Sequence, residues 1–242
     1  MILALLLNLS VSFASDYQGQ ASLSNCTGFI FKTQRTQASD KTLLATNGHC
    51  LQSLFGMILK PGQVKKNEKA SRSVTLYTTD GKAYQTKTAT LKFATMTDTD
   101  LAIYELSESY EDLAKKNIYP LTLATENPAQ GLEVTTISIR KKSKFNCRID
   151  KITDTREGGY TFSQAFRMSE ECRQINGTSG SPVMDTRTGE VVAIANTFNK
   201  NGKRCTDNNP CEAEGEEIRV MHRARYAQRI IPDVLEIENE TN

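Results

Sequence analysis

Three polar residues, far apart along the chain, carry side chains that together can hydrolyse an acyl bond. His49 stands in an Asn-Gly-His-Cys motif, Asp100 leads into an apolar run, and Ser179 lies in the stretch NGTSGSP. A serine hydroxyl is a poor nucleophile unless a base takes its proton, and imidazole serves because its ordinary pKa of about 6.5 leaves it mostly neutral at pH 7. A carboxylate on the other ring nitrogen fixes the tautomer and stabilises the imidazolium ion. These residue types predict nucleophilic catalysis by a serine.

The stretch NGTSGSP, residues 176–182, contains two serines that could act as the nucleophile, Ser179 and Ser181. Taken alone, the stretch could equally be a polar surface turn. Gly177 and Gly180 flank Ser179, and glycine-rich backbone can present N–H groups to a developing oxyanion without steric cost. Read beside the histidine and aspartate motifs, the stretch favours Ser179.

The third member of the set has two candidates, Asp98 and Asp100. Asp100 directly precedes the apolar strand pattern of residues 101–104, which would hold its carboxylate rigidly. Asp98 fits a turn residue better. We therefore expect Asp100 to be the functional carboxylate.

Together the three motifs resemble those of the chymotrypsin (trypsin-like) family of serine proteases, over roughly residues 20–230. The resemblance implies two antiparallel six-stranded β-barrels with the active site between them. It makes Ser179 the nucleophile, His49 the general acid–base and Asp100 its orienting partner. It also places the oxyanion hole at the backbone N–H groups of Gly177 and Ser179.

Some residues depart from the pattern of the digestive members of that family. Thr178 stands where those enzymes carry an aspartate, and no Ile-Val-Gly-Gly sequence precedes Cys26, so activation by insertion of a new N-terminus is not expected. The form G-x-S-G-S-P-V is similar to that of bacterial secreted glutamyl endopeptidases. Residues 191–198 nevertheless lack the histidine that those enzymes use to bind an acidic side chain, which argues against glutamate specificity.

The resemblance places the substrate pocket at Arg173, Asn196, Thr197 and Phe198. Trypsin itself carries an aspartate at the position of Arg173, so tryptic specificity is not expected. Arg173 could attract an acidic side chain or turn outward to solvent, because arginine readily extends its charged group into water.

Six cysteines, an even number, indicate disulfide bonds and an oxidising compartment. The resemblance implies a Cys26–Cys50 bond. The remaining four would then pair as Cys147–Cys172 and Cys205–Cys211, but six cysteines allow 15 pairings and the sequence leaves these two open. No Cys-x-x-Cys pair or His-Glu-x-x-His helix is present, so no metal is expected.

Residues 1–14 form an apolar segment that ends in Ser-Phe-Ala, typical of a secretory signal peptide. We expect a secreted or periplasmic protein that is monomeric, needs no cofactor and acts on protein or peptide substrates. The 30 basic and 28 acidic residues are nearly balanced, which argues against nucleic-acid binding. No membrane association is expected after the signal peptide is cleaved.

Short β-branched and aromatic runs bounded by turns predict an all-β fold of paired barrels with a C-terminal helix. The predicted strands are residues 27–32, 41–46, 73–78, 101–106, 133–139, 145–152, 159–167, 182–184 and 190–198. Residues 15–118 would form the first barrel, with His49 and Asp100, and residues 119–242 the second barrel, with Ser179, and the helix. The spacing of Tyr226 and Ile230 predicts a helix over residues 222–231. The basic run 140–144 is typical of a solvated hairpin.

Two other functions fit some of these residues. The chain could be an inactive protease-fold binding module, although the intact His, Asp and Ser argue against it. It could also be an α/β-hydrolase-type esterase using Ser179 and His222. That fold requires G-x-S-x-G, whereas Ser181 stands two residues after Ser179, and the necessary alternation of strands and helices is missing.

Overall fold

A computed structural model describes residues 16–53, 56–57, 59–173 and 175–240. The segment expected to be a signal peptide lies outside the described residues. None of the helices described in the remainder is long and apolar enough to cross a membrane.

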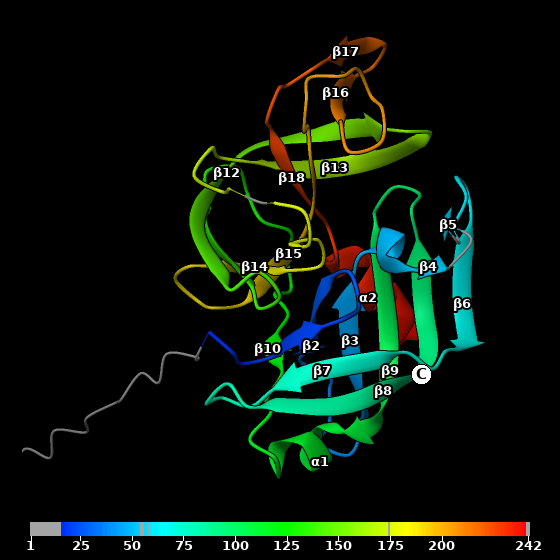
Figure 1. The fold of residues 1–242 in the computed structure, drawn as a ribbon, viewed down its shortest axis with the longest axis vertical. Coiled ribbons are helices and arrows are strands. Elements are labelled where there is room, and N and C mark those ends of the chain that lie inside the picture. Colours follow the sequence, from blue (N-terminus) through cyan, green and yellow to red (C-terminus); the bar gives the residue numbers. More distant parts are fainter. Residues whose placement is uncertain (1–15, 54–55, 58, 174, 241–242) are drawn as a thin grey trace, which may run out of the picture.

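The first half of the chain forms an antiparallel barrel (Figure 1). The pairing of β1 with β2 closes its ring. Its strands, in ring order, are β1 (Gln20–Ser22), β7 (Ser73–Tyr77), β8 (Ala83–Thr95), β9 (Leu101–Ser109), β3 (Lys41–Thr46) and β2 (Thr27–Lys32). Additional short strands are β6 (Val64–Lys69), which pairs with β8, and β4 (Gln52–Ser53), which pairs with β5 (Gly56–Met57). Inward-facing side chains such as Ile30, Leu44 and Tyr104 fill the interior.

The second half forms another closed ring of six antiparallel strands, which β11 and β12 complete. Its strands, in ring order, are β11 (Glu133–Ser138), β14 (Pro182–Asp185), β15 (Val191–Phe198), β18 (Arg225–Gln228), β13 (Tyr160–Met168) and β12 (Ser143–Glu157). A hairpin of β16 (Cys211–Glu214) and β17 (Glu217–Arg219) extends the sheet from β12. The predicted two-barrel fold is therefore confirmed.

Most of the predicted strands occur where the sequence pattern places them, including β2 and β3 with the expected bounds. The Asp80-Gly81 turn joins β7 to β8, and Gly81 takes φ +84°, which an L-residue rarely adopts. The basic run 140–144 lies at the turn between β11 and β12, as expected.

The helix predicted over residues 222–231 is wrong. Residues 225–228 form β18, which pairs with both β13 and β15, and Tyr226 is fully buried in that barrel. The C-terminal helix, α2, runs over Ile231–Glu240. The spacing of Tyr226 and Ile230 is misleading, because Tyr226 lies within β18, whereas Ile230 follows the strand and belongs to the cluster that α2 shares with the first barrel.

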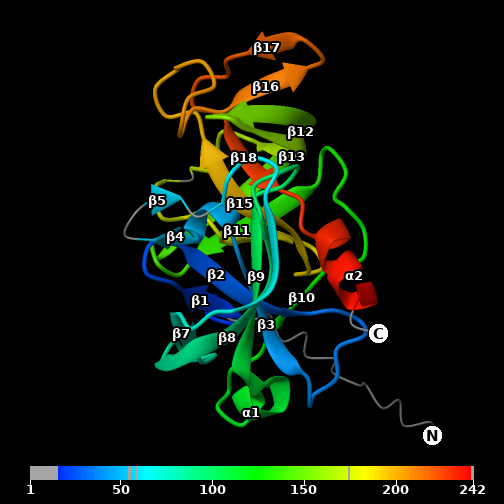
Figure 2. The same ribbon diagram turned by 90° about the vertical axis from the view of Figure 1, so that its right-hand side faces the viewer.

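Helix α2 packs against the first barrel, although it follows the second in sequence (Figure 2). Its buried residues Ile231, Val234 and Ile237 belong to one hydrophobic cluster with Phe29 and Ile103 of the first barrel. The short strand β10 (Leu121–Thr122) likewise pairs in parallel with β2. The boundary predicted at residues 118/119 stays a prediction, and β10 and α2, on its C-terminal side, contact the first barrel.

The connection between the barrels begins with helix α1 (Tyr110–Ala114), which starts at a capping box. The Ser109 hydroxyl accepts a hydrogen bond from the backbone N–H of Asp112, whose carboxylate accepts one from the backbone N–H of Ser109. This reciprocal pair satisfies two N–H groups at the start of the helix.

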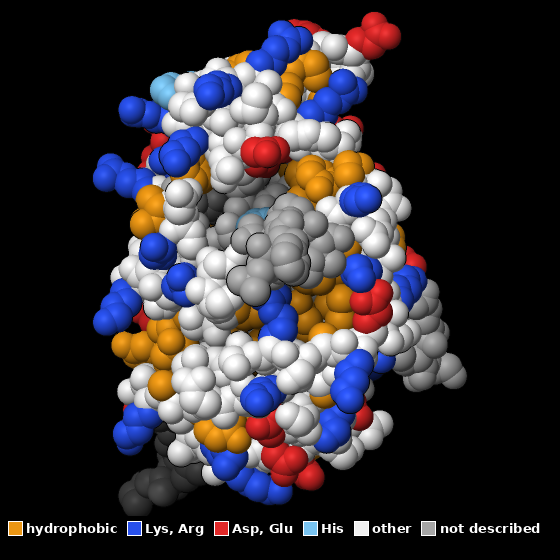
Figure 3. All heavy atoms as spheres, turned by 45° about the vertical axis from the view of Figure 1, so that its right-hand side comes forward, with side chains coloured by type: hydrophobic (Ala, Val, Ile, Leu, Met, Phe, Trp, Pro, Cys, Tyr) orange, Lys and Arg blue, Asp and Glu red, His pale blue; other side chains and the backbone are white. Residues whose placement is uncertain are grey.

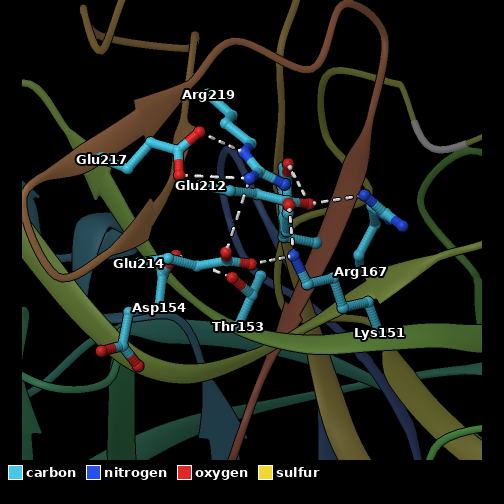
Figure 4. A network of polar contacts seen from close by, with 9 residues as sticks. Lys151, Thr153, Asp154, Arg167, Glu212, Glu214, Glu217 and Arg219 are labelled. Carbon is cyan, nitrogen blue, oxygen red and sulfur yellow. Dashed lines mark hydrogen bonds and ion pairs between the residues drawn. The ribbon is translucent and has the colours of Figure 1, made fainter.

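A buried carboxylate, Glu212, holds the β16–β17 hairpin against the second barrel (Figure 4). Its Oε2 lies 3.1 Å from Lys151 Nζ on β12, and its Oε1 lies 2.8 Å from Arg167 NH1 on β13. The Glu212 side chain is 1% exposed, so the two cations compensate a charge that water cannot reach.

Candidate active site

His49 is held in a single 3₁₀ turn, Gly48–Cys50, directly after β3. Its Nδ1 lies 2.6 Å from Asp100 Oδ2, and its backbone N–H donates to Asp100 Oδ1 at 2.9 Å. A Cβ atom at Gly48 would collide with the Thr95 backbone carbonyl, so glycine is required for this close approach. The carboxylate therefore fixes both the backbone and the ring of His49, which makes Nδ1 the proton-bearing nitrogen and turns Nε2 away from Asp100.

Asp98, the competing carboxylate, is engaged elsewhere. Its Oδ1 accepts a hydrogen bond from the Ser163 hydroxyl at 3.0 Å, and its backbone pairs with Thr161 and Ser163 of β13. Asp98 has φ +62°, a turn conformation that joins the two barrels. Of the two candidates, Asp100 is the one in contact with His49.

Several effects combine to set the pKa of His49. Burial disfavours the charged imidazolium, but the negative charge of Asp100, its hydrogen bond to the ring and the more distant charge of Glu157 together raise the pKa above its ordinary value. The His49 side chain is 25% exposed, so a substrate can still reach it.

Ser179 lies in a loop whose shape depends on two glycines. Gly177 and Gly180 take φ +90° and +84°, in the left-handed region that favours glycine. A Cβ atom at Gly180 would also clash with the Thr27 carbonyl. In this structure Ser179 Oγ donates to the backbone carbonyl of Asn196 at 3.1 Å. Attack on a substrate therefore requires the hydroxyl to turn from Asn196 to His49.

Ser181, the competing serine, is 1% exposed and lies behind this loop. Its backbone N–H donates to Thr178 and its carbonyl accepts from Ala195. Its position is structural, and it does not line the pocket that contains His49.

Thr27 on β2 fastens the Ser179 loop to the first barrel. Its backbone N–H donates to the Ser179 carbonyl at 2.9 Å, and its hydroxyl donates to the Gly177 carbonyl at 3.2 Å. The same hydroxyl lies 2.8 Å from Ser138 Oγ, and the Thr46 hydroxyl donates to the Thr27 carbonyl at 2.8 Å. The motifs did not indicate these residues, because an isolated threonine in a strand carries no catalytic signal.

The backbone N–H groups around Ser179 fall into two kinds, those with an acceptor and those without one among the described residues. Thr178 N–H donates to Ile175 and Gly180 N–H donates to Ala195, both within the loop region. No acceptor for the N–H groups of Gly177 and Ser179 is found in the part of the chain that the structure describes. These two donors are the ones that the resemblance assigns to the oxyanion.

A pocket of about 330 Å³ brings His49, Asp100 and Ser179 together between the two barrels. Figure 3 shows a hollow in the middle of this face, with a histidine side chain at its edge. The other lining residues are Met96, Glu157, Tyr160, Phe162, Ile175, Asn176, Asn196, Thr197, Phe198, Asp207 and Asn208.

Three of the four residues predicted for the substrate pocket, Asn196, Thr197 and Phe198, line this cavity. Arg173 does not: its side chain is exposed and lies outside the pocket lining. Of the two orientations considered for Arg173, the structure has the outward one.

His222 is exposed and lies against Gly202, away from the residues that line the Ser179 pocket. The fold consists of antiparallel barrels. The alternative esterase arrangement with Ser179 and His222 is therefore wrong.

All three disulfide bonds, Cys26–Cys50, Cys147–Cys172 and Cys205–Cys211, are present. The first joins the residue before Thr27 to the residue after His49. The sulfur atoms of Cys26 and Cys50 also lie near His49 in the only grouping of metal-ligand type among the described residues, but they are bonded to each other and are not thiolate ligands.

Comparison with protein-family models matches residues 26–194, more than half of the chain, to the trypsin-like peptidase domain. The chain belongs to this family. Membership supports a serine-protease function. No match to a curated protein was found.

The trypsin-like peptidase fold is also found among solved structures. An inactive serine-to-alanine mutant of Rv3671c from M. tuberculosis matches with a TM-score of 0.51 and 14% identity, over 91% of this chain and 84% of that one. Deg5 matches with a TM-score of 0.50 and 14% identity, over 90% and 84%. The HtrA-type protease AlgW, with a decapeptide, matches with 0.51 and 12%, over 88% of this chain and 50% of its own. At such identities the likeness shows the fold alone, and the similarity to glutamyl endopeptidases stays a prediction.

Proposed function

We propose that this chain is a secreted serine endopeptidase in which Ser179, His49 and Asp100 form the catalytic triad. The observation that supports it is the contact between Asp100 and His49. The Asp100 carboxylate bonds both Nδ1 and the backbone N–H of His49, and these two residues line one pocket with Ser179. Asp100 orients the ring so that Nε2 can take the proton of Ser179.

In the proposed reaction, Ser179 Oγ attacks the scissile carbonyl while His49 takes its proton. The N–H groups of Gly177 and Ser179 stabilise the oxyanion. His49 then gives the proton to the leaving amine, and water hydrolyses the acyl-enzyme by the same steps in reverse order.

One edge of β15 is available to pair with a peptide substrate. Thr197 and Phe198 pair with β18 on one side, whereas the pairing of β15 with β14 ends at Ile194 opposite Pro182. On that second side, residues 196–198 have no strand partner among the described residues. An extended peptide can add to this edge as an antiparallel strand and bring its carbonyl to Ser179.

The proposal is tested by comparing wild type with Ser179→Ala, His49→Ala and His222→Ala on casein and with a fluorophosphonate probe. We expect the first two variants to lose hydrolysis and the third to keep it, because His222 lies outside the pocket. Labelling that survives Ser179→Ala would contradict the proposal. The export expected from residues 1–14 is tested by fractionation of producing cells and N-terminal sequencing of the mature protein.

A further inference from the structure

The pocket beside Ser179 is lined by acidic groups. Asp100, Glu157 and Asp207 line it, whereas its described lining contains no Lys or Arg and His49 is its one basic group. Asp100 is committed to His49 by two hydrogen bonds. Glu157 and Asp207 remain as acidic groups without an assigned role.

Glu157 lies at the end of β12, where its side chain reaches the substrate edge of β15. Its Oε1 accepts hydrogen bonds from the Thr197 hydroxyl at 3.2 Å and from the Asn208 backbone N–H at 2.7 Å. Both donors are neutral and both engage the same oxygen. No cation pairs with Glu157 among the described residues, so its Oε2 is the atom that can accept a bond from a ligand.

The loop between Cys205 and Cys211 fixes Glu157 and Asp207 in place. The Gly158 N–H donates to the Cys205 carbonyl at 2.8 Å, directly beside Glu157. The Asn209 side chain donates to the Asp207 carbonyl at 3.0 Å and to the Thr206 hydroxyl at 3.1 Å. The disulfide-closed loop therefore holds Glu157 at the wall of the pocket and the exposed Asp207 at its edge.

Asn196 provides an independent indication that this pocket binds a polar ligand. Asn196 is 6% exposed and lines the pocket, yet neither its Oδ1 nor its Nδ2 has a hydrogen-bond partner within the described chain. Buried amide groups are almost always paired, and an unpaired one calls for a specific explanation. A polar substrate group that enters the pocket would supply the missing partner.

We infer that this pocket binds a Lys or Arg side chain of the substrate, with the Glu157 carboxylate as its principal counter-charge and Asp207 at the pocket edge. This inference rests on the proposed peptidase function and names its substrate class. A substrate strand laid along residues 196–198 runs past Thr197, which is hydrogen-bonded to Glu157. Arg173, which could have attracted an acidic side chain or turned outward, lies outside the pocket.

The raised pKa of Glu157 is consistent with a carboxylate that has no cationic partner in the described part of the chain. Burial raises the pKa of Glu157 to about 7, against the opposing effects of its hydrogen bonds and of His49, while Asp100 adds to the rise. Asp207 is the further acid beside it. A bound ammonium or guanidinium group would favour the carboxylate, so affinity for a cation should rise as the pH increases through about 7.

The substrate preference is tested with a positional-scanning peptide library on wild type, Glu157→Gln and Arg173→Ala. We expect a preference for Lys or Arg at one position in wild type and in Arg173→Ala. In Glu157→Gln, kcat/KM for basic peptides should fall at least tenfold relative to neutral peptides, because a hydrogen bond between charged groups is lost. A preference for Asp or Glu, or no basic preference at any position, would overturn the inference and leave the peptidase proposal standing.

A second measurement does not depend on hydrolysis. Benzamidine, an aromatic amidinium ion, is titrated calorimetrically into Ser179→Ala and into Ser179→Ala/Glu157→Gln. We expect binding to the first protein that tightens between pH 6 and pH 8 and weakens at least tenfold in the second. Equal affinity for the two proteins would overturn the inference. The two proposals can also be separated. If benzamidine binding depends on Glu157 but the wild type cleaves no peptide, the cation-binding pocket is supported and the proposed peptidase function is contradicted.

Discussion

Asp100 accepts hydrogen bonds from both the ring and the backbone of His49, so a single side chain fixes the position and the tautomer of the proposed base. Asp100 is 2% exposed, which keeps its carboxylate from exchanging these bonds for water. The position of the His49 ring and the position of its backbone thus both depend on Asp100.

Replacing Asp100 with Asn should retain the fold and remove most activity. The amide has nearly the same shape, but with its oxygen on the His49 backbone N–H its NH2 group would face Nδ1 as a donor. Nδ1 would then have to accept a hydrogen bond, so His49 would favour the tautomer protonated at Nε2. We expect kcat to fall by about 10³- to 10⁴-fold. Peptide hydrolysis and the thermal unfolding midpoint measure the two effects, and a loss of less than tenfold would contradict the assigned role of Asp100.

The pH dependence of activity follows from the raised pKa of His49. Only the neutral imidazole can take the Ser179 proton, so kcat/KM should fall as the pH drops through a pKa that lies above the ordinary value of 6.5. In Glu157→Gln a negative charge that stabilises the imidazolium is removed, and the acid limb should move to lower pH. A neutral peptide substrate separates this shift from substrate binding, and an unchanged limb would contradict the coupling of Glu157 to His49.

The meeting of His49, Asp100 and Ser179 in one pocket was predictable, because each stands in a short motif whose neighbours have local roles. Gly177 and Gly180 beside Ser179 are examples. Glu157 was not predictable. It reaches the site because the end of β12 lies against the Cys205–Cys211 loop, and no sequence pattern near residue 157 predicts this contact. Arg173 illustrates the converse, since its place in the sequence suggested a pocket that its side chain does not enter.

At the scale of elements, β2 connects both halves of the site. Cys26 is bonded to Cys50 next to His49, and Thr27 binds the loop that carries Ser179. Cys26, directly before this strand, and Thr27, its first residue, therefore position groups that come from different barrels.

Replacing Thr27 with Val should loosen the Ser179 loop while preserving the volume of the side chain. The hydroxyl contacts with Gly177 and Ser138 are lost, and each hydrogen bond contributes about 1 kcal/mol. We expect kcat to fall about tenfold. Thr75→Val on β7, distant from the site, serves as the control, and equal kcat values in the two variants would argue against this role of Thr27.

The Glu212 network makes a stability prediction for the β16–β17 hairpin. Glu212→Ala leaves Lys151, Arg167 and the Tyr226 hydroxyl without their shared partner. Because the two cations are about a quarter exposed and can be rehydrated, we expect a loss of about 2–3 kcal/mol in the free energy of unfolding, at the low end for a broken buried pair.

Glu217→Ala, at an exposed ion pair of the same hairpin, is the matched control and should cost less than about 1 kcal/mol. Urea unfolding of both variants measures the difference. Similar losses would show that burial of Glu212 has no special effect.

Strand elements were predictable where apolar residues alternate between turns, as in β2, β3 and β9. Strand β8 is absent from the strands that the pattern predicts, because the buried positions of its first half are the polar residues Thr86 and Thr88, which give no apolar alternation. Strand β18 was mistaken for a helix because residues 226–228 are all buried, which removes the alternation that marks a half-buried strand.

At the scale of the whole molecule, α2 unites the two barrels. Its apolar face shares a cluster with β2, β3 and β9, while β18 before it belongs to the second barrel. The Thr99 hydroxyl also donates to the Arg229 carbonyl at 2.8 Å, between β18 and α2. We therefore expect the two barrels to unfold in one cooperative transition.

Replacing Ile231 with Ala tests this coupling. Ile231 is 3% exposed, and truncation of a buried isoleucine costs about 2–5 kcal/mol. Leu235→Ala, on the exposed face of the same helix at 39%, should change stability by less than about 0.5 kcal/mol. Two separate transitions in the denaturation of the wild type, or equal losses in both variants, would contradict this role of α2.

The packing of α2 has a consequence for how the chain matures. The first barrel contains His49 and Asp100, yet its hydrophobic cluster is completed by Ile231, Val234 and Ile237, which are synthesised after the whole second barrel. A nascent chain that has emerged only as far as β15 already has the three side chains of the proposed triad but lacks the helix that supports the first barrel. On the proposed function, the order of synthesis would delay proteolysis until residues 231–237 have left the ribosome.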